Sequence, residues 1–210
     1  TKNSSRKIEK SFFLLPLFLK KQIYNTHFTH RRSMSLQERE ILNKTEINIL
    51  ISRLTRQLIE NHNLFHNSVL IGVQPRGIYV ANRLQQKLKE LSGIEVVTGS
   101  IDTTFFRDDF RRKEKPLLPS VTNLDFSIED KKVILVDDVL FSGRTVRAAM
   151  DALLTYGRPS SIELLVLVDR RFSRNLPIEA NYVGKYIDTL SNERVEVMWQ
   201  EIDGTDKVIL

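Results

Sequence analysis

The stretch VILVDDVLFSGRTV, residues 133–146, decides the fold of this chain. Its beginning, together with the residue before it, is the continuous apolar and β-branched run Lys132–Val136, which predicts a buried strand. The adjacent carboxylates Asp137 and Asp138 follow, and then a helix is predicted over Gly143–Tyr156, because its apolar residues recur at helical spacing. A buried strand that passes through polar residues into a helix indicates an α/β fold, in which ligands bind at the carboxyl ends of the strands.

The polar residues between the strand and the helix indicate a ligand with both hydroxyl and phosphate groups. The predicted helix begins with free backbone N–H groups, a favourable helix dipole and two hydroxyls, all of which suit a phosphate. These groups belong to Ser142, Gly143, Arg144 and Thr145. The two carboxylates before them suit the hydroxyls of a sugar. The glycine spacing and the lysine of a Walker loop are missing, so the pattern predicts a phosphorylated sugar rather than a nucleoside triphosphate at a P-loop.

The rest of the chain alternates predicted strands and helices. Asn43 is a predicted N-cap, with Glu46 three residues later as in a capping box. The further predicted elements are a helix over 45–61, a strand over Ser68–Val73, a helix over Ile78–Leu91, and strands over Ile94–Ile101 and Ser161–Val168. This alternation predicts a mostly parallel twisted sheet flanked by helices, followed by a small C-terminal region. Residues 34–210 are expected to form one domain.

The composition separates the first 33 residues from the others. The chain has 210 residues, no Cys, and a net charge of +6, but residues 1–33 carry eight basic side chains and one acidic side chain, which leaves −1 for the rest. The absence of Cys excludes disulfide scaffolds and Cys-ligated zinc. The longest apolar run, Phe12–Leu19, is eight residues long, so no membrane span is predicted. We expect residues 1–33 to be a basic, disordered or non-native extension, with Met34 as the candidate native start.

Several segments together resemble one known family. They are GVQPRGIYVANRL (72–84), GSIDTTFFRDDF (99–110), VDDVLFSGRTVRAAMDAL (136–153) and YGRPSSIELLVLVDRR (156–171). The chain from Ile41 onward resembles the pyrimidine operon regulator (PyrR) branch of the type I phosphoribosyltransferases. The resemblance implies a cytoplasmic uracil phosphoribosyltransferase that converts uracil and phosphoribosyl pyrophosphate (PRPP) to UMP and pyrophosphate. It also implies Mg²⁺ held mainly by PRPP rather than by the protein, and a homodimer or larger homo-oligomer.

The resemblance assigns roles to particular residues. Asp137 and Asp138 would hold the ribose hydroxyls, and residues 142–145 with Val146 would hold the 5′-phosphate. Arg107 belongs to a flap over residues 106–115 that would close over PRPP. The pyrophosphate loop would consist of Gln74, Pro75, Arg76 and Gly77, in which the arginine supplies a cation and the glycine allows close backbone approach. A hood over the base would be formed by Asp169, Arg170, Tyr182 and Val183, although Tyr182 could equally be a core residue.

The choice of base follows from two departures from the purine-specific relatives. Phe141 stands where those relatives usually have an aspartate for base protonation, and Asp169 stands where they have a lysine that reads the purine. Both departures weigh against hypoxanthine and guanine. Arg171 and Phe172 stand where family members typically have a glycine, so the local backbone is in question.

The family's second role is binding of pyrimidine-operon leader RNA under the control of UMP or UTP. Arg53 and Arg56 are three apart on the polar face of a predicted helix and would project together. A second basic group is formed by Arg170, Arg171 and Arg174. Two alternatives to the enzyme with a regulatory role stay open: a UMP- or UTP-sensing RNA-binding attenuator with little catalysis, and a phosphoribosyltransferase for another base.

Overall fold

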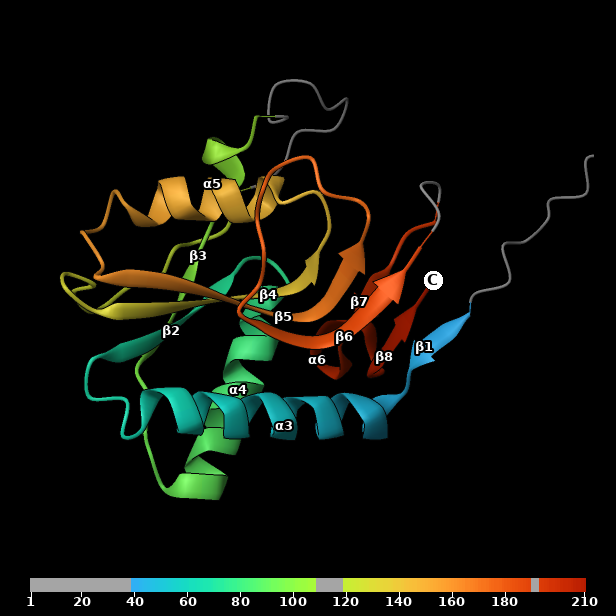
Figure 1. Ribbon diagram of the computed structural model, residues 1–210, viewed down its shortest axis with the longest axis horizontal. Coiled ribbons are helices and arrows are strands. Elements are labelled where there is room, and N and C mark those ends of the chain that lie inside the picture. The colour runs from blue at the N-terminus through green and yellow to red at the C-terminus, as the bar shows by residue number, and fades with distance from the viewer. Residues whose placement is uncertain (1–38, 109–118, 190–192) are drawn as a thin grey trace, which may run out of the picture. The chain divides into compact units, whose positions relative to one another are not determined.

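The computed structural model describes residues 39–108, 119–189 and 193–210 (Figure 1). The expectations about residues 1–33, and about the flap beyond Asp108, lie outside these residues. Within the described part of the chain, no helix is long and apolar enough to cross a membrane.

A five-stranded parallel sheet forms the centre of the fold. Its strand order is β3-β2-β4-β5-β6, with β2 Ser68–Val73, β3 Thr98–Ile101, β4 Lys132–Leu140, β5 Ser161–Arg171 and β6 Tyr182–Asp188. The predicted parallel sheet is confirmed. Only the last four residues of the predicted strand 94–101 belong to β3. Strand β4 is longer than predicted, because Asp137 and Val139 continue the pairing with β5, opposite Val166 and Val168.

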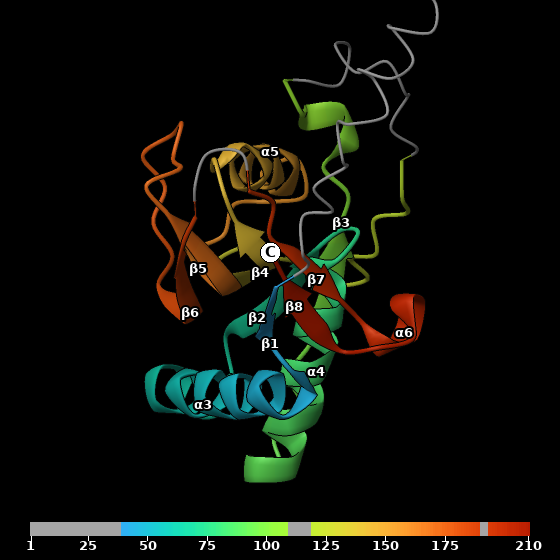
Figure 2. The same ribbon diagram turned by 90° about the vertical axis from the view of Figure 1, so that its right-hand side faces the viewer.

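Helices cover both faces of this sheet. Helices α3 (Lys44–His62) and α4 (Gly77–Ser92) lie on one face, whereas α5 (Arg144–Leu153) and the short 3₁₀ helix η1 (Thr104–Phe106) lie on the other (Figures 1 and 2). The predicted capping box is present: the Asn43 side chain accepts a hydrogen bond from the backbone N–H of Glu46 at 3.0 Å, and the Glu46 carboxylate accepts one from the backbone N–H of Asn43 at 2.8 Å.

The core consists of two apolar layers, one on each side of the sheet. Side chains of β4 alternate between them, with Ile134 and Val136 facing α3 and α4, and Val133 and Leu135 facing α5. All four are fully buried. A central strand buried on both faces reads as a continuous apolar run, which explains why Lys132–Val136 is so clear in the sequence.

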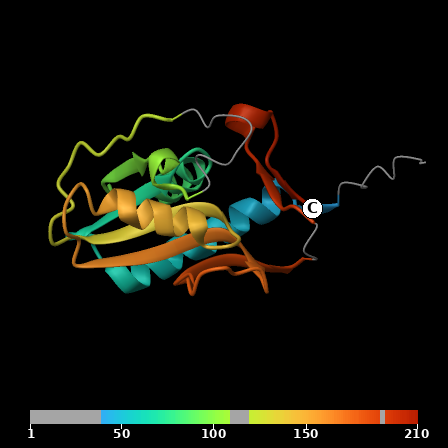
Figure 3. The same ribbon diagram turned by 90° about the horizontal axis from the view of Figure 1, so that it is seen from above.

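A second, antiparallel sheet is formed by β1 (Glu40–Leu42), β8 (Lys207–Ile209) and β7 (Glu196–Met198), with the one-turn helix α6 (Gln200–Asp203) between β7 and β8. We call this unit the hood sheet. Figure 3 shows it at one end of the large sheet. Arg76 lies three residues after the end of β2 and donates a hydrogen bond to the carbonyl oxygen of Val197, so the hood sheet lies at the carboxyl ends of the parallel strands. The chain therefore builds its ligand-binding end from both sheets.

Candidate active site

A cavity of about 300 Å³ lies between the end of β4 and the start of α5. Asp137, residues 139–146, Arg107 and Asn175 line it. The structure thus brings together Asp137, the predicted phosphate loop 142–146 and Arg107 from the segment after β3. Asn175 was not predicted, because it comes from the irregular segment between β5 and β6 and belongs to no motif.

The two adjacent carboxylates are desolvated and face different groups. Burial raises the pKa of Asp137 well above its usual range, and the neighbouring Asp138 raises it further. Burial also raises the pKa of Asp138, against a lowering contribution from the positive charge of Arg76. Asp137 lines the cavity, where Arg107 is the cation that lowers its pKa. The two carboxylates interact with each other, and Arg107 is the cation near Asp137 whereas Arg76 is the cation near Asp138.

The phosphate loop is held by backbone contacts. Gly143 has a left-handed φ of +86°, which is readily adopted by glycine, and it immediately precedes the first turn of α5. The carbonyl oxygen of Ser142 accepts hydrogen bonds from the backbone N–H groups of Asn175 at 3.0 Å and Leu176 at 3.2 Å. The Arg144 side chain forms an ion pair with Asp108. The loop therefore presents a helix N-terminus to the cavity, with its shape fixed from the opposite side by residues 175–176.

The predicted pyrophosphate loop, residues 74–77, lies against β4. A Cβ atom at Gly77 would be 2.4 Å from the carbonyl oxygen of Val136, so glycine lets the loop approach the strand just before its carboxylates. The Gln74 amide donates to the carbonyl oxygen of Val121 at 2.7 Å. Arg76 forms an ion pair with Asp203 of the hood sheet at 2.8 Å. Sequence reasoning missed Asp203, which is distant in the chain and stands in no recognisable motif.

For Tyr182, the sequence leaves open whether the side chain belongs to the base hood or to the core. This side chain is buried at the start of β6, where its hydroxyl donates to Glu163 at 2.7 Å and accepts from Asn61 at 3.0 Å. Burial, followed by the Glu163 hydrogen bond, raises its pKa to about 12. Because β6 begins at Tyr182, opposite Leu165, the ring lies well before the carboxyl end of the sheet. Tyr182 is a core residue in the structure.

The other residues of the predicted base hood, Asp169, Arg170 and Val183, are not among the residues that line this cavity. The guanidinium of Arg170 lies 4.1 Å from the ring centre of Phe141, which lines the cavity. Arg170 also donates to the Thr189 hydroxyl at 3.0 Å and to the Glu193 carbonyl oxygen at 2.9 Å. Asp169 forms an ion pair with Arg174. Val183 packs against the apolar layer on the α5 side.

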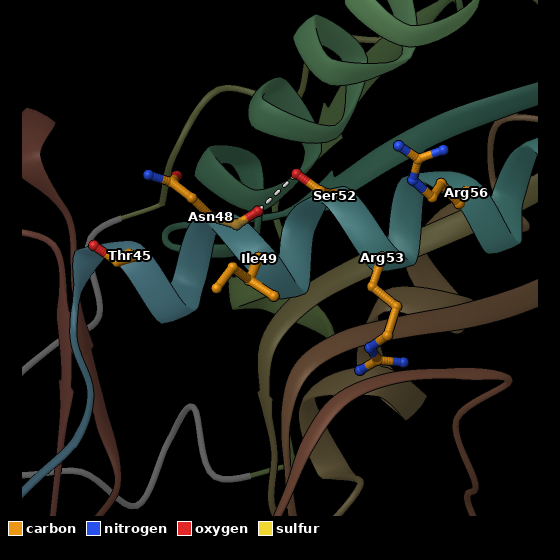
Figure 4. A pocket seen from close by; sticks show the side chains of 6 residues that line it. All are labelled: Thr45, Asn48, Ile49, Ser52, Arg53 and Arg56. Carbon is orange, nitrogen blue, oxygen red and sulfur yellow. Dashed lines mark hydrogen bonds between the residues drawn. The ribbon is translucent and has the colours of Figure 1, made fainter.

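The arginines predicted to contact RNA do not form one surface. Arg170 is buried, and Arg174 donates to four backbone carbonyl oxygens besides its ion pair with Asp169, so neither is presented to a partner. Arg171 is exposed and paired with Asp188 at 2.7 Å. Arg53 and Arg56 line a surface groove of about 470 Å³ along α3, but they point in different directions (Figure 4). Both residues are exposed, and the Arg53 guanidinium donates to the carbonyl oxygens of Val183 and Gly184 on β6.

The donor set of this site fits a metal ion brought by a ligand. No cluster of three or more metal-binding side chains occurs among the described residues. Mg²⁺ commonly binds one or two carboxylates and takes its other ligands from phosphate oxygens and water. The adjacent Asp137 and Asp138 match that requirement.

Comparison with known proteins agrees with this geometry. Residues 37–201 match the family model described as phosphoribosyl transferase domain. The chain is 44% identical over 178 residues to the "Bifunctional protein PyrR" of Desulfosudis oleivorans, which covers 84% of this chain and 98% of the relative. It is 47% identical over 177 residues to the protein of the same name from Deinococcus radiodurans, over 84% of this chain and 96% of the relative.

Solved structures show the same fold at low sequence identity. A hypoxanthine phosphoribosyltransferase from Staphylococcus aureus superposes with a TM-score of 0.61 at 22% identity, over 81% of this chain and 90% of that chain. One from Trypanosoma cruzi gives a TM-score of 0.64 at 18% identity, over 82% and 90% of the two chains. These likenesses confirm the predicted fold and carry no information on the base.

Proposed function

Because the chain belongs to the PyrR family of phosphoribosyltransferases, we propose that it transfers the phosphoribosyl group of PRPP to uracil, giving UMP and pyrophosphate. The observation that carries the proposal is the cavity at the end of β4, which is lined by Asp137, the helix start at 142–146 and Arg107. Its neighbour, the loop 74–77, supplies Arg76 beside Asp138. One end of the sheet thus offers groups for a phosphate, a sugar diol and a pyrophosphate.

The proposed mechanism uses each group at a different part of PRPP. The 5′-phosphate binds the N–H groups at the start of α5, and the ribose hydroxyls donate to the desolvated carboxylates of Asp137 and Asp138. The bond between C1 and the pyrophosphate oxygen breaks while the bond from uracil N1 to C1 forms, and the N1 proton leaves to solvent. The transition state carries oxocarbenium character, as at other anomeric centres, and the two carboxylates stabilise it electrostatically. Mg²⁺, when bound with PRPP, offsets the charge of the leaving pyrophosphate.

Two side chains favour a pyrimidine over a purine as the acceptor base. Phe141 lines the cavity and has no group that exchanges a proton with a base. The Asp169 carboxylate is engaged in an ion pair with Arg174 instead of a contact with a purine. The test is UMP formation from uracil, PRPP and Mg²⁺, with hypoxanthine and orotate assayed in parallel. Turnover with uracil alone is expected; turnover with another base only would refute the choice of uracil. Absence of turnover with all three, despite binding of PRPP or UMP, would favour a nucleotide-sensing attenuator.

The substitution Asp138→Asn tests whether this carboxylate acts in the reaction rather than in folding. We expect Asp138→Asn to lower kcat/KM for PRPP by about 100-fold, because it weakens electrostatic stabilisation of the transition state. Asp151→Asn is the matched control, since Asp151 is an exposed carboxylate on α5 that pairs with Arg147 at 2.9 Å. Circular dichroism should show the same fold for both variants. Unchanged turnover of Asp138→Asn would remove Asp138 from the site.

A regulatory role in RNA binding is the second part of the proposal, supported by the word "bifunctional" in the names of the relatives. Exposed Arg56 on α3 is the best candidate for a phosphate contact. We expect Arg56→Gln to weaken binding of pyrimidine-operon leader RNA and to reduce the salt slope by about 1, with Lys87→Gln on α4 as the control. RNA binding should increase with UMP. No RNA binding with or without UMP would leave the enzymatic activity alone.

The proposed partners imply where and in what form the protein works. A nascent transcript as partner implies a cytoplasmic protein. We also propose a homodimer or larger homo-oligomer, which light scattering of the purified protein tests; a monomeric mass would refute it.

A further inference from the structure

The guanidinium of Arg76 is held by the hood sheet. Its Nη1 donates to the carbonyl oxygen of Val197 at 2.5 Å and to Asp203 Oδ2 at 2.8 Å, and its Nη2 donates to Asp203 Oδ1 at 3.3 Å. Asp203, at the end of α6, also accepts the backbone N–H of Trp199 at 2.9 Å. The Arg76–Asp203 pair therefore joins the loop after β2 to the segment 197–203, about 120 residues away in the chain, and Glu196 Oε1 lies at the longer distance of 3.9 Å from Arg76 Nη2.

This pair is ionised and only partly buried. The hydrogen bond to Arg76 lowers the pKa of Asp203, and the same bond raises the pKa of Arg76. The side chains of Arg76 and Asp203 are 27% and 19% exposed. Partly exposed ion pairs contribute little to stability, whereas two-point contacts of arginine with a carboxylate fix the direction of the guanidinium. The geometry therefore indicates orientation rather than stability as the consequence of the pair.

The contacts also leave part of the guanidinium available. An arginine has five N–H groups in a rigid fork, and Val197 and Asp203 accept three of them. The backbone end of the side chain is fixed as well, because Gly77 packs directly on Val136 of β4. Both ends of Arg76 are thus held, with the Nε–H and one Nη2–H not used by these two partners.

We infer that Asp203 is a positioning residue for the reaction: it holds the Arg76 guanidinium so that its remaining N–H groups face the pyrophosphate of PRPP. The inference rests on the proposed function and adds the group that orients the pyrophosphate-binding cation. In this inference Asp203 acts on the ligand through Arg76, and Arg76 acts on the pyrophosphate part of PRPP. The effect of losing Asp203 is therefore confined to ligands that carry a pyrophosphate.

The test measures binding of three ligands with Mg²⁺ by isothermal titration calorimetry on the full chain: PRPP, pyrophosphate and UMP. Asp203→Asn removes the charge and one acceptor, and Asp203→Glu keeps the charge. Glu201→Gln is the matched control, because Glu201 lies on the same short helix and pairs with Arg83 at 2.9 Å instead of Arg76. Thermal melting followed by the fluorescence of Trp199, the chain's single tryptophan, checks that each variant is folded.

We expect Asp203→Asn to raise the Kd of PRPP and of pyrophosphate by about tenfold, the scale of one charge-assisted hydrogen bond, and to leave the Kd of UMP within about twofold. Asp203→Glu should recover most of the loss, and Glu201→Gln should bind all three ligands as the wild type does. Equal weakening of all three ligands would show a structural role and overturn the inference. Unchanged PRPP binding would overturn it too, and tighter PRPP binding would show that Asp203 competes with the ligand for Arg76. A wild-type chain that binds neither PRPP nor UMP would refute the proposed function itself.

Discussion

The close contact between loop 74–77 and β4 leads to a quantitative prediction for Gly77→Ala. The added Cβ would lie 2.4 Å from the carbonyl oxygen of Val136 and 3.0 Å from the Cα of Asp137. Carbon atoms pack best about 3.5–4.0 Å apart, so the loop has to move away from β4 by about 1 Å. Both contacts are backbone atoms of the central strand, which cannot rotate aside as a side chain can. Overpacking of this kind costs about 1–3 kcal/mol in the free energy of unfolding.

The same displacement should reduce catalysis far more than stability. Misplacement of a reacting group by about 1 Å can cost about 100-fold in rate, and Arg76 is carried on the displaced loop. The assay is kcat/KM for PRPP at saturating uracil, together with urea unfolding. Gly184→Ala is the control, because its Cβ would lie at the same 2.4 Å from the carbonyl oxygen of Leu167, and neither residue lines the cavity. Both variants should lose stability, and only Gly77→Ala should lose activity. A Gly77→Ala protein that unfolds more easily but keeps kcat/KM within about twofold would refute the reasoning.

Three further predictions concern buried polar groups. Burial raises the pKa of Asp137 in the folded state, so the charged carboxylate lowers the stability of the folded protein at neutral pH. Asp137→Asn should therefore raise Tm by at least about 2 °C while it lowers turnover. The gain in Tm should shrink as the pH falls, because the wild-type carboxyl group then becomes protonated. Tyr182→Phe should lower the free energy of unfolding by about 1–2 kcal/mol and leave the KM for uracil unchanged. A raised KM for uracil would show that Tyr182 belongs to the base hood. Burial lowers the pKa of His62 below 6.5 in the folded protein, so on acidification the unfolded chain takes up this proton at a higher pH than the folded chain does. The stability of the wild type should therefore fall as the pH drops below about 6.5. A His62→Gln variant whose Tm depends on acid pH in the same way would contradict this.

The features that could be predicted from the sequence are those that depend on neighbours in the chain. The capping box of Asn43, the buried run of β4 and the helix start after Gly143 all arise from local periodicity and backbone chemistry. That Asp137 and residues 142–146 lie together was predictable for the same reason, because they belong to one ten-residue stretch of the chain, 137–146.

The features that could not be predicted depend on contacts between distant segments. Hydrogen bonds with Glu163 on β5 and with Asn61 on α3 decide whether Tyr182 lies in the base hood or in the core. Asn61 is far away in the chain. Asp203 meets Arg76 across 127 positions, and Asn175 reaches the cavity from an irregular segment. Neither Asp203 nor Asn175 belongs to a periodic pattern, so nothing in the neighbouring sequence predicts which distant residues it contacts.

Strand β1 pairs with β8, with Glu40 opposite Ile209, so this contact can form only after β8 has been synthesised. A ribosome makes β1 at the start of the domain and β8 at its end, and chains fold from the N-terminus as they emerge. All the strands of the parallel sheet are synthesised before β7, α6 and β8. A nascent chain therefore acquires residues 137–146 before it acquires Asp203, and the Arg76 guanidinium lacks its contacts with Val197 and Asp203 until residues 197–203 have left the ribosome. The order of the elements along the chain thereby makes the fixing of the Arg76 guanidinium a later event than the formation of the parallel sheet.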